Sequence, residues 1–224
     1  QVELSGANYS LNALVADDAF RNYVDEASVF TGDPAIVHSF MQRFDDLWTD
    51  TTSYTNYANV TTPKRRYARY PLAAEMNFPP LHSYRDRAVA PYDAETAGID
   101  AIMYRITDRA HTDAILAAVA RGVPVRLITE PDQYRLVDRM WHSWNVDRLY
   151  MGGVQVKHRA HAGLNHQKSV ILYDQNGTVA GDQSMVIFGS SNWTSPSANG
   201  QVEHNMFTTK PDLVSWYIDQ FERK

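Results

Sequence analysis

The sequence lacks cysteine, long apolar runs and an excess of basic charge. It has 224 residues and no cysteine, which excludes disulfides, thiol catalysis and cysteine-ligated zinc and leaves the compartment open, with secretion slightly favoured. No segment approaches the ~18 unbroken apolar residues of a membrane span, so no transmembrane segment is expected. The formal net charge of −5 argues against a general nucleic-acid coat, because non-specific binding depends on phosphate neutralisation by Lys and Arg.

What the sequence does contain is an internal repeat. The stretch Glu26–Trp48 resembles the stretch Glu203–Lys224 at a constant offset of 177 residues (203 − 26). The matching pairs are Phe30 and Phe207, Pro34 and Pro211, Val37 and Val214, and Phe44 and Phe221. Self-similarity of this kind indicates a duplicated structural unit.

A similar turn precedes each stretch, with Asn8 in "LSGANYS" and Asn192 in "FGSSNWT". His166, the head of a His-x-Lys pattern, stands 26 residues before Asn192 (192 − 166). The first repeat's counterpart of His166 would therefore stand upstream of Asn8, outside the sequence given. We expect the end of a first repeat in residues 1–50, a connector in 51–72 and a complete second repeat in 73–224.

The second repeat alternates predicted strands and helices. Strands are expected at 99–106, 123–130, 154–158, 166–174, 184–192 and 203–209. Helices are expected at 108–122, around 131–149 and from Pro211 onward. Strands joined by helices through short connections imply a parallel or mixed sheet that helices cover.

The polar residues of this repeat suit a phosphoryl group. Residues two apart in a strand face the same way, so His166 and Lys168 should project together while Gln167 points opposite. A Gly-Ser-x-Asn turn with Ser190 and Asn192 offers backbone N–H groups, a hydroxyl and a carboxamide. Together these groups could bind phosphoryl oxygens, and the histidine could attack phosphorus or protonate a leaving oxygen.

These motifs resemble the phospholipase D superfamily. His-x-Lys at 166–168, Gly-Ser-x-Asn at 189–192 and the acidic Glu203 follow in the family's order. "AIMYRITD", "AILAAVARGVPVR" and "FGSSNWT" look like its second half, and "SGANYS" and "NYVDE" look like the tail of its first half. The resemblance implies an α/β fold, a mixed β-sheet flanked by helices, with a pseudo-two-fold repeat whose first copy is truncated.

The resemblance also implies a chemistry. It is that of a phosphodiester hydrolase with two His-Lys-Asp motifs, which works through a phosphohistidine and needs neither metal nor cofactor. His166 would be the general acid/base, and the histidine of the missing first-half motif would be the nucleophile. Activity would therefore require that missing His-Lys motif.

The other site residues are carried over by their place in the motifs. Lys168 and Asn192 would bind phosphate, with Ser190 lining the same turn. Glu203, a carboxylate on the next strand, would orient His166 as the third member of a triad does.

Two residues of the first repeat complete the expected site. Asn8 would be the first repeat's phosphate ligand, and Glu26 would support the missing histidine.

One position departs from the family pattern. The motif continues Lys-x4-Asp, but the residue at that place is Tyr173. Asp174 is one place late, and Asp182 is far from Lys168, so neither is assigned to catalysis. In the family this Asp is chiefly structural, so the departure weakens the motif without excluding the chemistry.

Other interpretations stay open at this point. His158, His161 and His166 could suggest zinc, but a catalytic zinc site needs three well-placed ligands and no carboxylate stands at ligand spacing. Residues 63–69 are basic and aromatic and could touch lipid head groups or nucleic acid, or be a solvated linker. Trp141 and Trp144 could pack in the core or line a substrate rim.

The favoured function is lipid degradation by hydrolysis of a phosphatidyl-type phosphodiester. Alternatives are a nuclease or another phosphodiesterase of the superfamily, or an inactive fragment that serves only as a binding or assembly half. The expected partners are a phospholipid or another phosphodiester substrate, with no obligate nucleic acid. The missing N-terminal half would be a separate chain or lost, and a homodimer is a further way to bring two motifs together.

Overall fold

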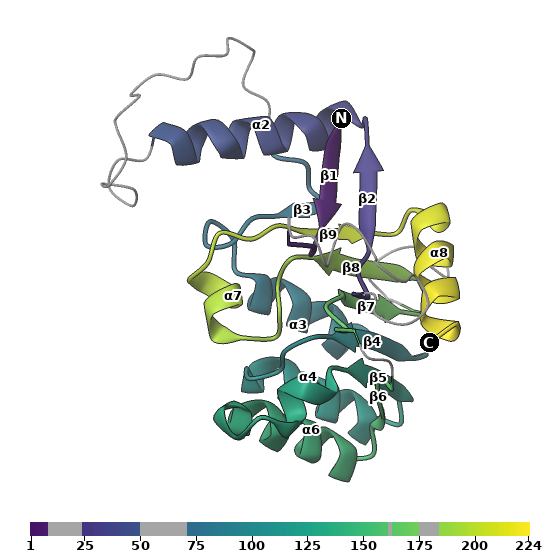
Figure 1. The fold of residues 1–224 in the computed structure, drawn as a ribbon. Helices are drawn as coiled ribbons and strands as arrows, with labels where there is room; N and C mark the ends of the chain where they lie inside the picture. The colour runs from purple at the N-terminus through teal and green to yellow at the C-terminus, as the bar shows by residue number, and fades with distance from the viewer. Residues whose placement is uncertain (9–23, 50–70, 161–162, 175–183) are drawn as a thin grey trace.

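The chain folds around one mixed β-sheet. The computed structural model describes residues 1–8, 24–49, 71–160, 163–174 and 184–224. In this part of the chain the larger sheet has seven strands in the order β3-β9-β8-β7-β4-β5-β6, and β1 and β2 form a separate sheet. Figure 1 shows β1, β2 and α2 at one end of the molecule and α4 and α6 at the other.

The described elements have the following bounds. The strands are β1 Val2–Ser5, β2 Ser28–Thr31, β3 Met76–Asn77, β4 Ile99–Met103, β5 Val125–Thr129, β6 Gln155–His158, β7 Lys168–Leu172, β8 Met185–Gly189 and β9 Asn205–Thr208. The helices are α2 Pro34–Thr49, α3 Tyr84–Ala94, α4 Arg109–Ala120, α5 Pro131–Arg135, α6 Met140–Met151, α7 Ser195–Asn199 and α8 Pro211–Glu222, with a 3₁₀ turn η1 at Val137–Arg139.

The parallel part of the sheet is β4, β5 and β6, as the strand-helix-strand pattern predicted. Helix α4 begins where the Asp108 side chain accepts the Ala110 N–H at 2.9 Å, a typical N-cap. It ends before Gly122, whose φ of 93° is left-handed backbone that glycine tolerates. Strand β4 stops at Met103, short of the predicted 106, so Tyr104 leaves the sheet.

The sheet has helices on both faces. Val170 and Leu172 of β7 pack in one apolar core with residues of α3, α4 and α6. Ile171, between them, packs in a second core with residues of α2 and α8. Strand β7 is buried along its whole length, as expected for a central strand covered on both faces. The predicted α/β class, a mixed sheet flanked by helices, is confirmed.

The internal repeat is visible in the strand pairing. Strand β1 pairs antiparallel with β2 so that Leu4 faces Val29, and β8 pairs antiparallel with β9 so that Phe188 faces Met206. The offsets are 184 (188 − 4) and 177 (206 − 29), and they hold for every pair in the two ladders. Since register fixes which side chains share a face, β1–β2 repeats β8–β9 residue by residue.

The first repeat packs directly on the second. The Ser5 N–H donates to Nε2 of His204 at 3.2 Å, and burial lowers the pKa of His204 to about 4, so this imidazole is neutral and can accept. A Cβ on Gly6 would lie 3.0 Å from the Gly189 carbonyl and 3.3 Å from Cδ of Lys168. The end of β1 therefore touches the strand that carries the His-x-Lys pattern.

The helices follow the same repeat. Helices α2 and α8 begin at Pro34 and Pro211, which the offset of 177 (211 − 34) relates. Most of the predicted connector, 51–72, lies outside the described residues. The boundaries at 50 and 73 stay predictions. None of the described helices is long and apolar enough to cross a membrane.

A buried carboxylate fixes the far end of β7. Glu95 is fully buried, and its Oε1 accepts N–H groups from Ala97 at 2.8 Å, Gly98 at 3.0 Å and Asp174 at 2.9 Å. The Asp174 carboxylate accepts from the Thr96 hydroxyl at 3.2 Å. Asp174, displaced by one place from the family pattern, thus belongs to the framework at the end of β7.

We expect Glu95→Ala to lower the free energy of unfolding by about 3 kcal/mol or more, because several buried N–H groups lose a charged acceptor. Chemical denaturation measures it. Asp93→Ala, at an exposed position of the same helix, is the matched control and should change stability by no more than about 0.5 kcal/mol. Equal, small effects of the two substitutions would contradict the framework role of Glu95.

Candidate active site

His166 and Lys168 lie together at the start of β7. Nζ of Lys168 is 2.9 Å from Nδ1 of His166, and it also donates to the His166 carbonyl. The Gln167 side chain is turned away and bonds Ser169 at 3.0 Å and Lys224 at 3.1 Å. The predicted common side of His166 and Lys168 is confirmed. Strand β7 itself begins at Lys168, so the prediction that His166 lies within the strand is wrong by two residues.

The first repeat holds this lead-in to β7 extended. The Asp25 N–H donates to the Leu164 carbonyl at 2.7 Å, and the His166 N–H donates to the Asp25 carbonyl at 3.0 Å. The Asp25 carboxylate forms ion pairs with Arg159 at 3.1 Å and Lys224 at 3.0 Å. The backbone around Asp25 thus acts as a short parallel strand that places the next residue, Glu26, against His166.

Glu26 is the carboxylate partner of His166. Its Oε1 contacts Nδ1 of His166, and the two side chains are only 9% and 17% exposed. A carboxylate only accepts hydrogen bonds, so this geometry assigns a proton to Nδ1. The Lys168 ammonium group donates to the His166 carbonyl, so it need not donate to Nδ1. Nε2 is then the ring nitrogen left for chemistry.

This pairing corrects the expected roles of the two acidic residues. Glu203 was expected to orient His166, and Glu26 to support the missing histidine. In the structure Glu203 accepts from the Ser197 hydroxyl at 2.9 Å, and its N–H donates to the Pro79 carbonyl at 3.2 Å. The expectation was wrong because it assumed pairing within one repeat, whereas the chain pairs His166 across the two repeats.

The Gly-Ser-x-Asn turn follows β8 closely. A Cβ on Gly189 would lie 2.1 Å from the His204 carbonyl, so only glycine allows this approach of β8 to β9. The Ser190 hydroxyl accepts the His204 N–H at 3.0 Å. It therefore links the turn to the residue before β9, and its expected place in the lining of a phosphate site stays a prediction.

Asn192 and Asn8 differ in their surroundings. Oδ1 of Asn192 accepts the Arg105 N–H at 3.2 Å, which fixes the amide and leaves its Nδ2 donor without a partner in the described residues. Asn8 is exposed at the end of the first described segment. Gly6, two residues before it, lies close to Lys168, and the role of Asn8 as a phosphate ligand stays a prediction.

Tyr104 is a site residue that the sequence analysis missed. Its ring stands edge-on to the His166 ring at 4.6 Å between centroids, and Nζ of Lys168 lies 5.4 Å from its centre. Its hydroxyl accepts from Nε2 of Gln133 in α5 at 2.9 Å. The signal that could have identified Tyr104 in the sequence is its position just after β4, since ligand-binding residues gather at the carboxyl ends of parallel strands.

Burial sets the charge of Lys168. It lowers the pKa of this ammonium group to about 8, and the carboxylates of Glu26 and Glu203 act against that decrease. Lys168 therefore lies within electrostatic reach of both acidic residues. It is a cation at neutral pH whose charge is lost just above pH ~8.

The zinc interpretation gains no support. His161, Asp182 and residues 63–69 lie outside the described residues. Among those described, no three His, Asp or Glu side chains gather as a metal site. His158 packs its ring on Tyr134 at 5.0 Å, away from a carboxylate ligand set.

Comparison with known families agrees with this fold. The family described as "Cardiolipin synthase, PLD-like domain" matches residues 94–224, more than half of the chain. The chain belongs to the phospholipase D-like family.

Several known proteins are similar. Human mitochondrial cardiolipin hydrolase is 25% identical over 166 residues, which are 74% of this chain and 60% of that protein, so the chain spans less than two thirds of its length. Among solved structures, Nuc from Salmonella typhimurium, a phospholipase D family member, has a TM-score of 0.54 at 18% identity over 66% of this chain and 90% of its own. Phosphatidylserine synthase from Haemophilus influenzae has a TM-score of 0.63 at 9% identity, over 99% of this chain and 59% of its own. These structures show the fold.

The lowered pKa of Lys168 predicts a pH dependence of anion binding. We expect sulfate, which does not titrate near neutrality, to bind less tightly as the pH rises through about 8, because the protonated ammonium is the form that attracts it. Calorimetric titration at several pH values measures this.

Lys168→Met should bind sulfate weakly and without this step. Two results would contradict the attribution of this pH dependence to the Lys168 ammonium group. One is a sulfate affinity that stays constant through this pH range, and the other is an equal decrease in affinity with pH in Lys168→Met.

Proposed function

We propose that this chain forms one half of a phospholipase D-type active site that hydrolyses a phosphodiester, with a phosphatidyl-type lipid as substrate. The observation that carries the proposal is the pairing of His166 with Glu26 beside the buried cation of Lys168. A histidine held at Nδ1 by a carboxylate, next to a lysine, can exchange a proton at Nε2 with an oxygen on phosphorus.

In the proposed reaction His166 is the general acid/base. A nucleophilic histidine from a second His-x-Lys motif forms a bond to phosphorus while the bond to the alcohol oxygen breaks, and Nε2–H of His166 protonates that oxygen. His166 then takes a proton from water, whose oxygen attacks phosphorus and breaks the phosphohistidine bond. Two histidines in opposite protonation states should give a bell-shaped pH profile.

Lys168 and Asn192 would bind the non-bridging oxygens. The lysine offers a positive charge in a largely buried site, where charge stabilisation is stronger than in water. Asn192 would use Nδ2, since its Oδ1 accepts from Arg105.

The second His-x-Lys motif would come from a complementary half. The sequence contains the pattern once, at His166. Strand β8 pairs with β9 and with β7, whereas β1 pairs in the described residues with β2 alone. A strand that repeats β7 would fit the open edge of β1. The repeat then gives Glu203 the role toward the second histidine that Glu26 has toward His166.

A lipid substrate is supported by the names of the similar proteins. The matching family is described as cardiolipin synthase, and the human, mouse and Xenopus relatives are named mitochondrial cardiolipin hydrolases. The formal charge of −5 also disfavours a long nucleic-acid track.

The test is turnover of a phospholipid by this chain assembled with a half that carries the second His-x-Lys. We expect His166→Ala to lower turnover by roughly 10² to 10⁴-fold, the usual contribution of general acid-base catalysis. Release of the head-group alcohol from phospholipid vesicles, with the phosphomonoester lipid as the other product, measures it.

His158→Ala is the matched control, because His158 is exposed and packs its ring on Tyr134 at 5.0 Å. It should keep the full rate. Near-full activity of His166→Ala, or loss of activity in His158→Ala together with sensitivity to a chelator, would contradict the proposal.

A further inference from the structure

An apolar surface stands open beside the site. Leu136, Val137, Met140 and Trp141, here called the rim, are 51%, 84%, 69% and 65% exposed. The rim runs from the end of α5 through η1 into α6. It borders a groove of about 590 Å³ that Tyr134 and Trp144 also line. Large apolar side chains gathered on one surface indicate a binding face, whereas single ones are ordinary.

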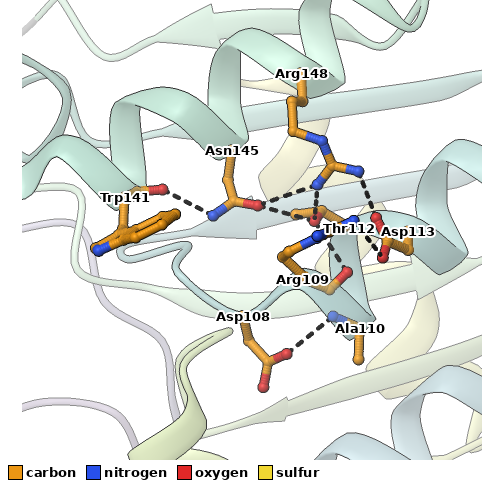
Figure 2. Close-up of polar contacts among 8 residues, drawn as sticks. All are labelled: Asp108, Arg109, Ala110, Thr112, Asp113, Trp141, Asn145 and Arg148. Atoms are coloured by element: carbon orange, nitrogen blue, oxygen red, sulfur yellow. Dashed lines mark hydrogen bonds and ion pairs between the residues drawn. The ribbon is translucent and has the colours of Figure 1, made fainter.

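The rim is held by a polar clamp beneath it. Figure 2 shows Asn145 of α6, which is fully buried, donating to the Trp141 carbonyl at 2.8 Å and accepting from the Thr112 hydroxyl of α4 at 3.0 Å. Arg148 bonds the same hydroxyl at 3.2 Å and pairs with Asp113. The first turns of α6 are therefore anchored to α4, and the exposure of Trp141 comes from an ordered helix.

The rim adjoins the catalytic pair. The ring of Tyr104 contacts that of His166 at 4.6 Å, and its hydroxyl bonds Gln133 in α5 at 2.9 Å. Leu136, the first rim residue, directly follows the last residue of α5, Arg135. Tyr104 and α5 therefore connect the rim to the proposed reaction centre.

Two arginines belong to the segments that form the rim and the site, since Arg139 stands between Val137 and Met140 and Arg105 directly follows Tyr104. Nε of Arg105 and Nε of Arg139 are both buried and have no partner among the described residues. Burial, and next the positive charge of Arg139, lower the pKa of Arg105, so the two guanidinium groups are close enough to repel each other. Arg135 is exposed beside them, and Asp138 is the exposed carboxylate of η1. A buried guanidinium N–H without a partner is costly unless an acceptor, such as an anion, meets it.

We propose that this face docks on an anionic phospholipid bilayer, with the rim in the acyl boundary and Arg105 and Arg139 on phosphate groups of the head-group layer. Apolar side chains with a tryptophan, next to arginines, are the chemistry of a helix that lies in a membrane interface. Docking on a bilayer does not depend on the proposed function. Only the hydrolysis of a docked phospholipid at His166 would rest on it.

Other occupants would need other chemistry. A nucleic acid would need a longer basic groove with aromatic platforms, and its binding would not depend on Val137 and Met140. A protein partner would leave the chain unbound to protein-free vesicles.

The experiment is sedimentation of the purified chain with vesicles of phosphatidylcholine containing phosphatidylglycerol, and with phosphatidylcholine alone. Met140→Ser should lower the partition coefficient about tenfold, since one large apolar side chain leaves the acyl boundary. Met151→Ser is the matched control, because Met151 is the same residue, 85% exposed, at the far end of the same helix. It should change nothing.

The arginines have their own control. Arg139→Gln should weaken binding about fivefold on the anionic vesicles and little on phosphatidylcholine alone. Arg223→Gln removes an exposed arginine at the C-terminal end of α8, outside the rim, and should have no effect. His166→Ala should bind vesicles like the unaltered chain, which separates docking from catalysis.

No vesicle binding, or equal losses in Met140→Ser and Met151→Ser, would overturn the proposal. Tight binding of a single-stranded oligonucleotide that Arg139→Gln abolishes and Met140→Ser leaves intact would assign the face to nucleic acid and would overturn it too. A failure of lipid turnover with normal vesicle binding would count against the proposed function and not against the docking face.

Discussion

The site depends on one short backbone pairing between the two repeats. Residues 24–26 and 164–166 run side by side in the manner of parallel strands, with Asp25 bonded to Leu164 and His166. This pairing brings Glu26 to the imidazole and places Lys168 on the same side. Arg159 and Lys224 neutralise Asp25, so the pairing can stay buried beside a second carboxylate. Without this segment His166 would have no carboxylate partner in the second repeat.

The duplicated strand register explains why the carboxylate comes from the other repeat. In each copy the acidic residue follows the Asn-bearing turn along the chain and precedes a strand, β2 or β9. In the structure the acidic residue of the first copy, Glu26, faces the histidine of the second, His166. Glu203 has the position in the second repeat that Glu26 has in the first. Its negative charge also raises the pKa of Lys168. The same arrangement gives the cation of Lys168 carboxylates from both repeats.

The sequence predicted the fold well because its periodic signals were strong. Helix α4 has a capping Asp108 and a terminal Gly122, and the apolar run after Lys168 allows only a buried strand. The repeat could be read from a constant offset, and the strand ladders carry it at the same offset. Helix α3 was missed, since Pro91 interrupts it and its face pattern is weak. The C-terminal end of β4 and both ends of β7 were predicted too far out. The end of a strand depends on how far its neighbours continue the hydrogen-bonded ladder, which the sequence does not show.

The site was predicted in its parts and not in its pairings. Motif order identified His166, Lys168, Asn192, Glu26 and Glu203, but order along the chain does not say which carboxylate faces which ring. That depends on how two repeats pack, which no local pattern encodes. The contact of Tyr104 with His166 and the hydrogen bond of the Ser190 hydroxyl also depend on packing, so the sequence did not predict them.

The most direct test is the tautomer of His166, read from imidazole ¹⁵N–¹H correlations of the purified chain. The cross-repeat pairing requires a proton on Nδ1, shared with Glu26. We expect that signal in the unaltered chain, its loss in Glu26→Ala, and no change in Glu203→Gln. A His166 ring that carries no proton on Nδ1, in the unaltered chain as in Glu26→Ala, would mean that Lys168 donates to Nδ1 instead, and that Glu26 does not hold the His166 ring.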